Sequence, residues 1–226
     1  MSAHFVPAAS NALMLKHLST EGFDSVYLDS RLLSTQLLGT SDTDLLSTSA
    51  YLNYVQTLSA STKMNVLADL CLNGQSQDLD QQVQVLKASG CVAVVVSDAD
   101  VANSTLFDEL LKNIKLAADN NLQIIVKLDG LVKYGFNELQ TRIGIALDNG
   151  LDHIIISNIT DDDLVIIKAV QDSALISLII DNANISYYSA LQFNPKFILD
   201  TFHVYQGLVH SASSISQNMI LKIFMG

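Results

Sequence analysis

Residues 91–129 read CVAVVVSDADVANSTLFDELLKNIKLAADNNLQIIVKLD, and this stretch contains a strand, a helix and a second strand. The apolar runs at 92–97 and 122–129 are short and rich in β-branched residues, which is typical of strands. The first run does not alternate apolar with polar residues, which indicates a strand that is covered on both faces. Between the two runs, helical periodicity extends over about 104–120. Units of this kind predict a parallel sheet covered by helices.

The same unit repeats toward both ends of the chain. Further strands are predicted at 4–9, 25–29, 64–69, 152–157, 175–180 and 196–200, and further helices at 11–22, 48–61, 79–90, 137–149, 184–192 and over much of 208–224. Eight strand–helix units in 226 residues predict a single (β/α)8 barrel domain, a TIM barrel, over residues 1–226. An open doubly wound sheet is the alternative. However, residues 7–12 (PAASNA) lack the Gly-rich turn of a dinucleotide fingerprint.

Residues at the expected helix ends support this pattern. Ser10 or Asn11 is expected to cap the first helix, and Gly22 is expected to end it. Thr160 is followed by aspartates at 161–163, which predicts a capped helix start with carboxylates at the positive end of the helix dipole. A metal site made of these three aspartates is the alternative.

The charge of the chain restricts its partners. It carries 23 acidic and 12 basic residues, for a formal charge of −11. Such a surface repels phosphate backbones and anionic lipid, so we expect neither nucleic acid nor membrane as a partner. The N-terminal stretch lacks the pattern of a secretory signal, and no apolar run approaches the roughly 18 residues of a membrane span. Cys71 and Cys91 are expected to be reduced thiols. We therefore expect a cytoplasmic protein.

Polar residues follow most of the predicted strands, at the rim where this fold collects its chemistry. They are Asp29, Ser30, Asp69, Ser97, Asp98, Asp129, Ser157, Asn158, Asp181, Asn182 and Asp200. Strand-to-loop junctions favour Asp, Asn and Ser as caps and turns, which is the structural alternative for any single residue. Taken together, the set predicts a polar pocket.

Lys127 lies inside a predicted strand that should be wholly apolar. Asp129 lies two positions further along the chain, so both side chains are expected on the same face. If that face is the barrel interior, the lysine lies near a carboxylate and holds an anion or acts in catalysis, as a base if burial lowers its pKa. The alternative is a lysine that leans outward between helices.

Several stretches, taken in order, resemble the isocitrate lyase/phosphoenolpyruvate mutase superfamily. PAASNALMLKHLSTEGFDSVYLDS (7–30) is similar to the opening strand, helix and second strand of that family. MNVLADLCLNG (64–74) resembles the strand with its metal motif, and IIVKLDG (124–130) resembles the strand with a substrate-binding arginine. The other matching stretches are 37–55, 92–100 and 150–157. The resemblance covers nearly the whole chain and implies a phosphoenolpyruvate mutase-like barrel.

The resemblance also implies a chemistry. Family members hold Mg²⁺ with carboxylates and cleave or form a C–C or P–C bond next to a 2-oxo acid or enolate. A small anionic 2-oxo acid or phosphonate is then the expected partner, and the family's tetramers favour a homo-oligomer. By this resemblance and their places at the rim, the expected site residues are Asp69 and Asp98 for the metal, Lys127 and Asp129 for catalysis, and Asp29, Ser30, Asp42 and Asn182 for the substrate.

The chain departs from the family at several of these positions. Cys71 and Ser97 stand where the family has metal-binding carboxylates, and Lys127 replaces the arginine. The long gating loop with the catalytic cysteine is absent, because residues 96–110 run almost directly into a helix. Mg²⁺ prefers several oxygen ligands, so metal binding should be weakened. We therefore predict a barrel that cannot run the standard lyase or mutase reaction. The alternative is an active lyase or mutase with a remodelled site.

Overall fold

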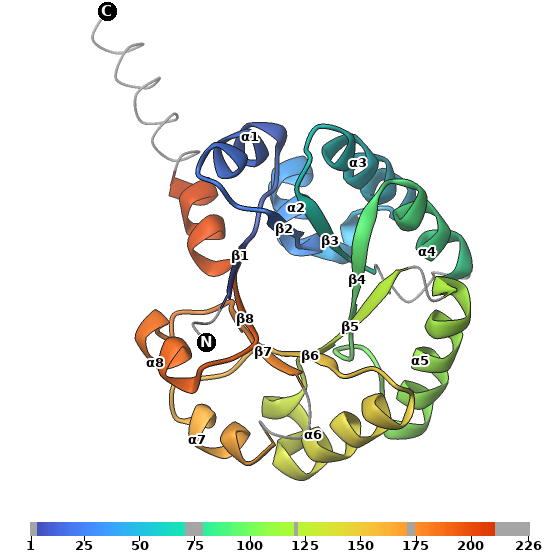
Figure 1. The fold of residues 1–226 in the computed structure, drawn as a ribbon, viewed down its shortest axis with the longest axis vertical. Helices are drawn as coiled ribbons and strands as arrows, with labels where there is room; N and C mark the ends of the chain where they lie inside the picture. Colours follow the sequence, from blue (N-terminus) through green and yellow to red (C-terminus); the bar gives the residue numbers. More distant parts are fainter. Residues whose placement is uncertain (1–3, 71–78, 120–121, 171–174, 211–226) are drawn as a thin grey trace, which may run out of the picture.

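A computed structural model of the chain describes residues 4–70, 79–119, 122–170 and 175–210. Eight parallel strands form an inner ring, and helices surround it (Figure 1). The strands are β1 (His4–Pro7), β2 (Ser25–Leu28), β3 (Asn65–Asp69), β4 (Cys91–Ser97), β5 (Gln123–Leu128), β6 (His153–Ile156), β7 (Leu175–Ile180) and β8 (Phe197–Asp200). The predicted (β/α)8 barrel is therefore confirmed.

The sheet runs in the order β1-β8-β7-β6-β5-β4-β3-β2 and closes almost completely. Its two end strands meet beyond β1, where Ala8 forms a parallel bridge with Tyr27. The amide of Ala9 donates a hydrogen bond of 3.0 Å to the carbonyl of Tyr27. This contact brings the C-terminal end of β2 next to that of β1, which completes the rim.

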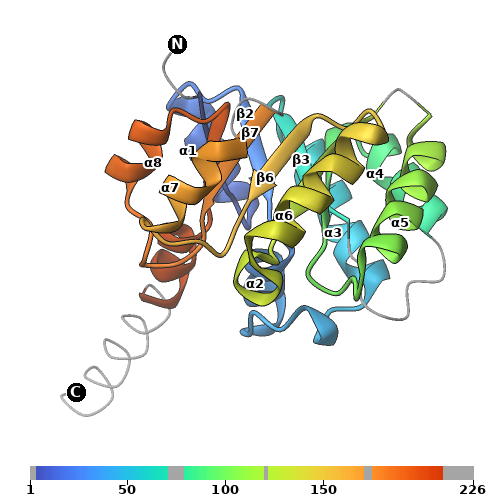
Figure 2. The same ribbon diagram turned by 90° about the horizontal axis from the view of Figure 1, so that it is seen from below.

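Helices follow the strands around the ring. They are α1 (Ala12–Thr20), α2 (Ser30–Leu38), α3 (Thr48–Ala60), α4 (Leu79–Ala88), α5 (Ser104–Ala118), α6 (Leu131–Asp148), α7 (Asp163–Ile167) and α8 (Tyr187–Phe193), with short 3₁₀ turns η1 (Thr43–Leu45) and η2 (Lys168–Val170). Figure 2, turned by 90°, shows the long helix α6 lying across the outside of the strands. No helix in the described part of the chain is long and apolar enough to span a membrane.

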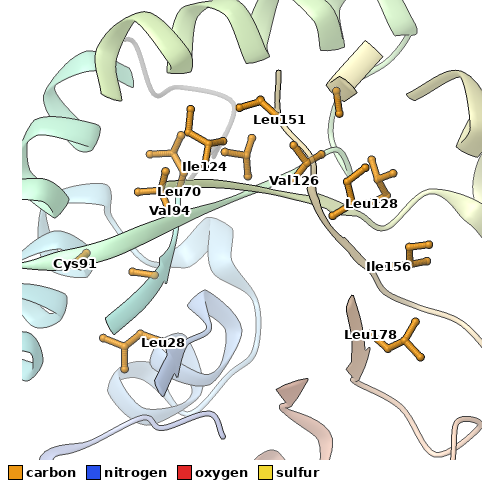
Figure 3. Close-up of a cluster of buried hydrophobic side chains, with 14 of the residues drawn as sticks. Leu28, Leu70, Cys91, Val94, Ile124, Val126, Leu128, Leu151, Ile156 and Leu178 are labelled. Carbon is orange, nitrogen blue, oxygen red and sulfur yellow. The ribbon is translucent and has the colours of Figure 1, made fainter. Parts of the chain in front are cut away.

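Alternate residues of each strand face opposite sides of the barrel wall. One buried cluster holds residues from every strand and fills the interior. It includes Val6, Tyr27, Leu67, Val95, Ile125, Ile155, Ile179 and Leu199. The residues between them belong to a larger cluster shared with the helices, such as Leu128, Ile156 and Leu178 on neighbouring strands (Figure 3). The strands are therefore covered on both faces, as the apolar runs indicated.

The expected ends of the first helix agree with the structure. Asn11 is the N-cap of α1, and its side chain accepts a hydrogen bond of 3.0 Å from the amide of Met14. Gly22 has a φ of 88°, which ends the helix in the left-handed conformation. The predicted cap at Thr160 is wrong, because Asp162 is the N-cap of the five-residue helix α7 and its side chain makes no capping hydrogen bond. Thr160 instead donates hydrogen bonds of 2.8 Å from its amide and its hydroxyl to Asp163.

Two helical segments differ from the expectations. No helix is predicted between the strand at 25–29 and the helix at 48–61, but α2 lies there, where Asp29 caps it and Gly39 ends it. Helix α6 begins at Leu131 rather than near Asn137, because a first turn precedes an interruption at Gly135. After β8 the chain is helical over 202–210. The rest of the helix expected at 208–224 lies outside the described residues.

Gly135 provides a test of the interruption in α6. Its φ of 77° and ψ of 174° lie in a region that is essentially restricted to glycine. An added Cβ would meet nothing within 4 Å, so the cost of Gly135→Ala should be backbone strain alone. We expect the free energy of unfolding in urea to fall by about 1–3 kcal/mol.

The matched control is Gly144→Ala in the same helix. Its Cβ would also meet nothing within 4 Å, and its backbone is helical. Alanine there should raise the stability by about 0.5–1 kcal/mol. If the two substitutions changed the free energy of unfolding equally, Gly135 would not have the left-handed backbone conformation described above.

Candidate active site

The inner rim of the barrel is polar because polar residues stand two positions after the interior apolar residues. Asp29 lies two positions after Tyr27, and Asp69 lies two positions after Leu67. The same spacing places polar residues at the ends of other strands. The full inner set is Asp29, Asp69, Ser97, Lys127, Asp129, Ser157, Asp181 and Thr201. Since side chains two apart on a strand share a face, these groups converge on one end of the barrel.

A cavity of about 430 Å³, which we call the rim cavity, lies at this end. Its polar lining includes Ser30, Arg31, Asp69, Ser97, Asp100, Lys127, Asp129, Lys133, Asn158, Asp181 and Asn182. The loops after several strands therefore contribute to one cavity, as the sequence predicted for the C-terminal rim of this fold.

Lys127 lies in the rim cavity rather than between the helices. It is only 6% exposed, and its Nζ is 3.5 Å from Oδ1 of Asp129. Burial by itself would lower the pKa of Lys127, but the carboxylates of Asp129 and Asp69 outweigh burial and raise it. The lysine therefore stays charged. This disfavours the role of a base, which required burial to lower the pKa.

Asp129 is held as a carboxylate by three partners. Burial would raise its pKa, but Lys127 and hydrogen bonds from the hydroxyls of Ser157 and Ser97 lower it. The Ser97 hydroxyl donates to Oδ2 at 2.5 Å, and the Ser157 hydroxyl donates to Oδ1. Ser97 and Ser157 therefore orient Asp129.

Asp69 has donors on both oxygens. Oδ1 accepts from the Tyr27 hydroxyl, and Oδ2 accepts from the amide and the hydroxyl of Ser30 at 2.8 and 2.7 Å. Burial, followed by the neighbouring charge of Asp29, raises the pKa of Asp69. Ser30 thus lines the cavity and also positions Asp69.

Asp98 faces the opposite side of the barrel wall. Its Oδ1 accepts a hydrogen bond of 2.7 Å from the amide of Asp129, and its Oδ2 lies 2.9 Å from Nη1 of Arg142 on α6. The same guanidinium bonds to Glu138 and stacks over Tyr134. Burial raises the pKa of Asp98, although the Asp129 amide and Arg142 oppose the shift. Asp98 does not line the rim cavity, so this geometry does not favour it as a metal ligand.

Some of the other residues expected to bind substrate line a cavity, and others do not. Asn182 lines the rim cavity, while Asp29 lines an adjoining smaller cavity. Asp42 lines neither of these cavities, and its side chain caps the short turn η1. Cys71 lies outside the described residues.

Arg31 and Lys133 were missed as site residues. Arg31 lies in the first turn of α2 and lines both cavities, and Lys133 lies in the first turn of α6. The carboxylate of Asp29 is the main cause of a raised pKa for Arg31. The sequence does show that Arg31 is a basic residue close to the end of a predicted strand. However, the direction of its side chain depends on α2, which the sequence did not predict.

The described residues do not fit a bound Mg²⁺ well. Among them, no group of three His, Cys, Asp or Glu side chains is arranged to hold a metal ion. Both oxygens of Asp69 already have donors, and both oxygens of Asp98 point away from the cavity into other contacts. Asp161 bonds to Ser186 and Asp163 bonds to Thr160, so these two aspartates serve local structure.

No protein-family model matches the sequence, and no curated protein matches it in sequence. Solved structures do match its fold. A 2,3-dimethylmalate lyase, described as a PEP mutase/isocitrate lyase superfamily member, has a TM-score of 0.84 and 18% identity, and the match covers 98% of this chain and 82% of that chain.

Two other matching structures are named as hydrolases of small organic acids. Oxaloacetate acetylhydrolase has a TM-score of 0.84 and 14% identity, and the match covers 97% of this chain and 81% of that chain. Phosphonopyruvate hydrolase, solved with oxalate and Mg²⁺, has a TM-score of 0.83 and 18% identity, with coverage of 99% and 83%. These matches confirm the resemblance at the level of the fold: the chain has a PEP mutase/isocitrate lyase-type barrel.

The Asp98–Arg142 pair predicts a structural role that differs from metal binding. Arg142→Met leaves a buried carboxylate without its cation, and we expect a loss of about 3–5 kcal/mol in the free energy of unfolding. The double variant Asp98→Asn/Arg142→Met should recover part of this loss, because the uncompensated charge is removed.

Lys112→Met is the control, since Lys112 forms an exposed pair with Asp108 on α5. Such exposed pairs contribute little, so its unfolding curve in urea should nearly overlay that of the parent. If Arg142→Met behaved like this control, the Asp98–Arg142 pair would not be structural.

Proposed function

We propose that the chain is a PEP mutase-like barrel that binds a small 2-oxo carboxylate on Lys127 and does not run the magnesium-dependent lyase or mutase reaction. The observation that carries this proposal is the buried Lys127, which remains charged and opens into the rim cavity. A buried ammonium is tolerated only when it is paired. A bound carboxylate can share the ammonium with Asp129, since an ammonium has three donors.

The charge around Lys127 supports a small anion as the ligand. Arg31 and Lys133 add two further cations to the lining of the rim cavity. Burial raises the pKa of Asp181 and of Asp69 above its ordinary value. The structural matches named for oxaloacetate and phosphonopyruvate bind small anions of this kind, which supports the same class here.

The donor set supports binding without Mg²⁺. Asp69 accepts hydrogen bonds from Tyr27 and Ser30. Asp129 pairs with Lys127, and Asp98 pairs with Arg142. Mg²⁺ requires several oxygens in near-octahedral geometry. We therefore assign the cationic role at this site to the lysine ammonium.

A second candidate is an active lyase or mutase with a remodelled site. The charged state of Lys127 favours it, because an ammonium beside the ligand can stabilise the negative charge of an enolate. In this case Lys127 acts through its charge, and Asp129 keeps it in place. Cytoplasmic location and a homo-oligomer stay predictions under either candidate.

Binding is tested by thermal denaturation with pyruvate or oxalate. Each acid should raise the Tm of the parent protein, since a ligand that binds only the native state stabilises it, and added Mg²⁺ should not increase the rise. Lys127→Met should weaken binding at least about tenfold, because a hydrogen bond to a charged group contributes about 1.5–3 kcal/mol. Lys127→Arg should retain part of the binding, since it keeps the charge.

Lys112→Met again serves as the matched control, because it removes a lysine charge far from the rim. It should show the same rise in Tm as the parent. A rise that depends on Mg²⁺, or that survives Lys127→Met unchanged, would contradict the proposal.

A turnover assay distinguishes the two candidate functions. It measures the pyruvate that is released from phosphonopyruvate and from 2-methylmalate-type acids. The proposal expects no turnover above buffer, with or without Mg²⁺. Turnover that falls by about 100-fold or more in Lys127→Met and partly returns in Lys127→Arg would favour the active lyase or mutase instead.

A further inference from the structure

A second cavity of about 200 Å³ adjoins the rim cavity, and we call it the side cavity. It is lined by Asp29, Arg31, Leu32, Ser41, Asp181, Thr201, Phe202 and Tyr205. Arg31 and Asp181 line both cavities, so the two spaces are neighbours with shared walls. A ligand whose carboxylate lies on Lys127 can therefore direct its other end toward the side cavity.

Asp29 lines the side cavity, and one of its carboxylate oxygens has no hydrogen-bond partner among the described residues. The residue is 1% exposed, and its Oδ1 accepts a hydrogen bond of 2.9 Å from the amide of Leu32, which caps α2. Its Oδ2 is buried and accepts no hydrogen bond from any residue in the described ranges. A buried carboxylate oxygen without a donor is costly, so this atom indicates a missing donor.

The other polar groups of the side cavity restrict the nature of that donor. The guanidinium of Arg31 has its Nη2 3.8 Å from Oδ2 of Asp29, beyond hydrogen-bonding distance, and it supplies only donors. An ammonium on the ligand would satisfy Asp29 but would lie beside the like charge of Arg31. A carboxylate on the ligand would satisfy Arg31 but would face Asp29 and Asp181. A neutral hydroxyl group avoids both repulsions, because it donates to Asp29 and accepts from Arg31.

The remaining walls are consistent with a hydroxylated carbon chain. Leu32 and Phe202 provide apolar surface for the carbon atoms, and the hydroxyls of Thr201 and Tyr205 can both donate and accept. The side cavity is small, so it suits one short polar tail rather than a large substituent.

From this geometry we infer that the side cavity is a subsite for a ligand hydroxyl group, and that the chain takes a 2-oxo carboxylate with a hydroxyl at its far end. This inference rests on the proposed function, since Lys127 is taken to hold the carboxylate. It adds a preference that Lys127 cannot create, because the preference comes from Asp29 and Arg31, which line the side cavity.

The test compares pairs of acids that differ by one hydroxyl group. Calorimetric Kd values are measured for pyruvate against hydroxypyruvate, and for 2-oxobutyrate against 4-hydroxy-2-oxobutyrate. The hydroxylated member of at least one pair should bind about tenfold more tightly to the parent protein. Oxaloacetate, which ends in a carboxylate, should bind no more tightly than 2-oxobutyrate.

Variants then assign the preference to the side cavity. Asp29→Ser keeps a side chain that can cap α2 but removes Oδ2, and the ratio of the two Kd values should fall to near one. Arg31→Met removes the opposing donor without touching the cap, and it should also reduce the ratio. Asn103→Ser is the matched control, because it changes the cap of α5 and lies in neither cavity. It should leave the ratio unchanged.

The outcomes separate the subsite from the proposed function. If the parent binds 2-oxo acids in a manner that depends on Lys127, but both ratios are near one, the subsite is overturned and the proposed function stands. If the preference persists in Asp29→Ser and Arg31→Met, the hydroxyl is recognised elsewhere and the subsite is also overturned. If none of the acids binds, both inferences fail together.

Discussion

The alternation of side chains along each strand is the constraint on which this structure depends. In a closed barrel, one face of every strand fills a narrow interior and the other face meets the helices. The interior cluster and the outer cluster follow this rule along all eight strands. A strand-end aspartate at an inner position therefore meets other charged groups at the rim, whereas an aspartate one position away meets a helix. Asp129 and Asp98 illustrate the two outcomes, since one contacts Lys127 and the other contacts Arg142.

Charge balance at the inner rim follows from this constraint. Five aspartates, at 29, 69, 100, 129 and 181, line the two cavities together with the cations Arg31, Lys127 and Lys133. The protein accommodates the excess of carboxylates in different ways. Asp129 is held ionised by Lys127 and two serine hydroxyls, while burial raises the pKa of Asp69 and of Asp181. The result is a site in which a lysine inside a strand is buried and charged.

The comparison with solved structures separates the fold from its chemistry. The barrel matches lyases and hydrolases over nearly its whole length, at 14–18% identity in the three cases described above. At such identity the matches show the fold alone. In this chain Ser97 orients Asp129, and Asp69 bonds to Tyr27 and Ser30. These contacts use the groups that a metal would need, which is why the proposed function relies on Lys127.

The sequence by itself determined the barrel, because strand and helix patterns are local and each apolar run shows how it is buried. It also determined that Lys127 and Asp129 share a face, since a spacing of two is independent of register. It did not predict α2 or the first turn of α6. Asp29 can be recognised as a cap, and Gly135 as an interruption, only when their backbone conformations are known.

Only the tertiary structure decided which strand ends face inward and which cations meet them. Asp98 and Asp129 look alike in the sequence, but their surroundings depend on where each strand leaves the sheet and on which helix lies behind it. Arg142 is 44 residues from Asp98, and Arg31 reaches the rim only because α2 begins directly after β2. Such contacts join distant parts of the chain, so no local pattern records them.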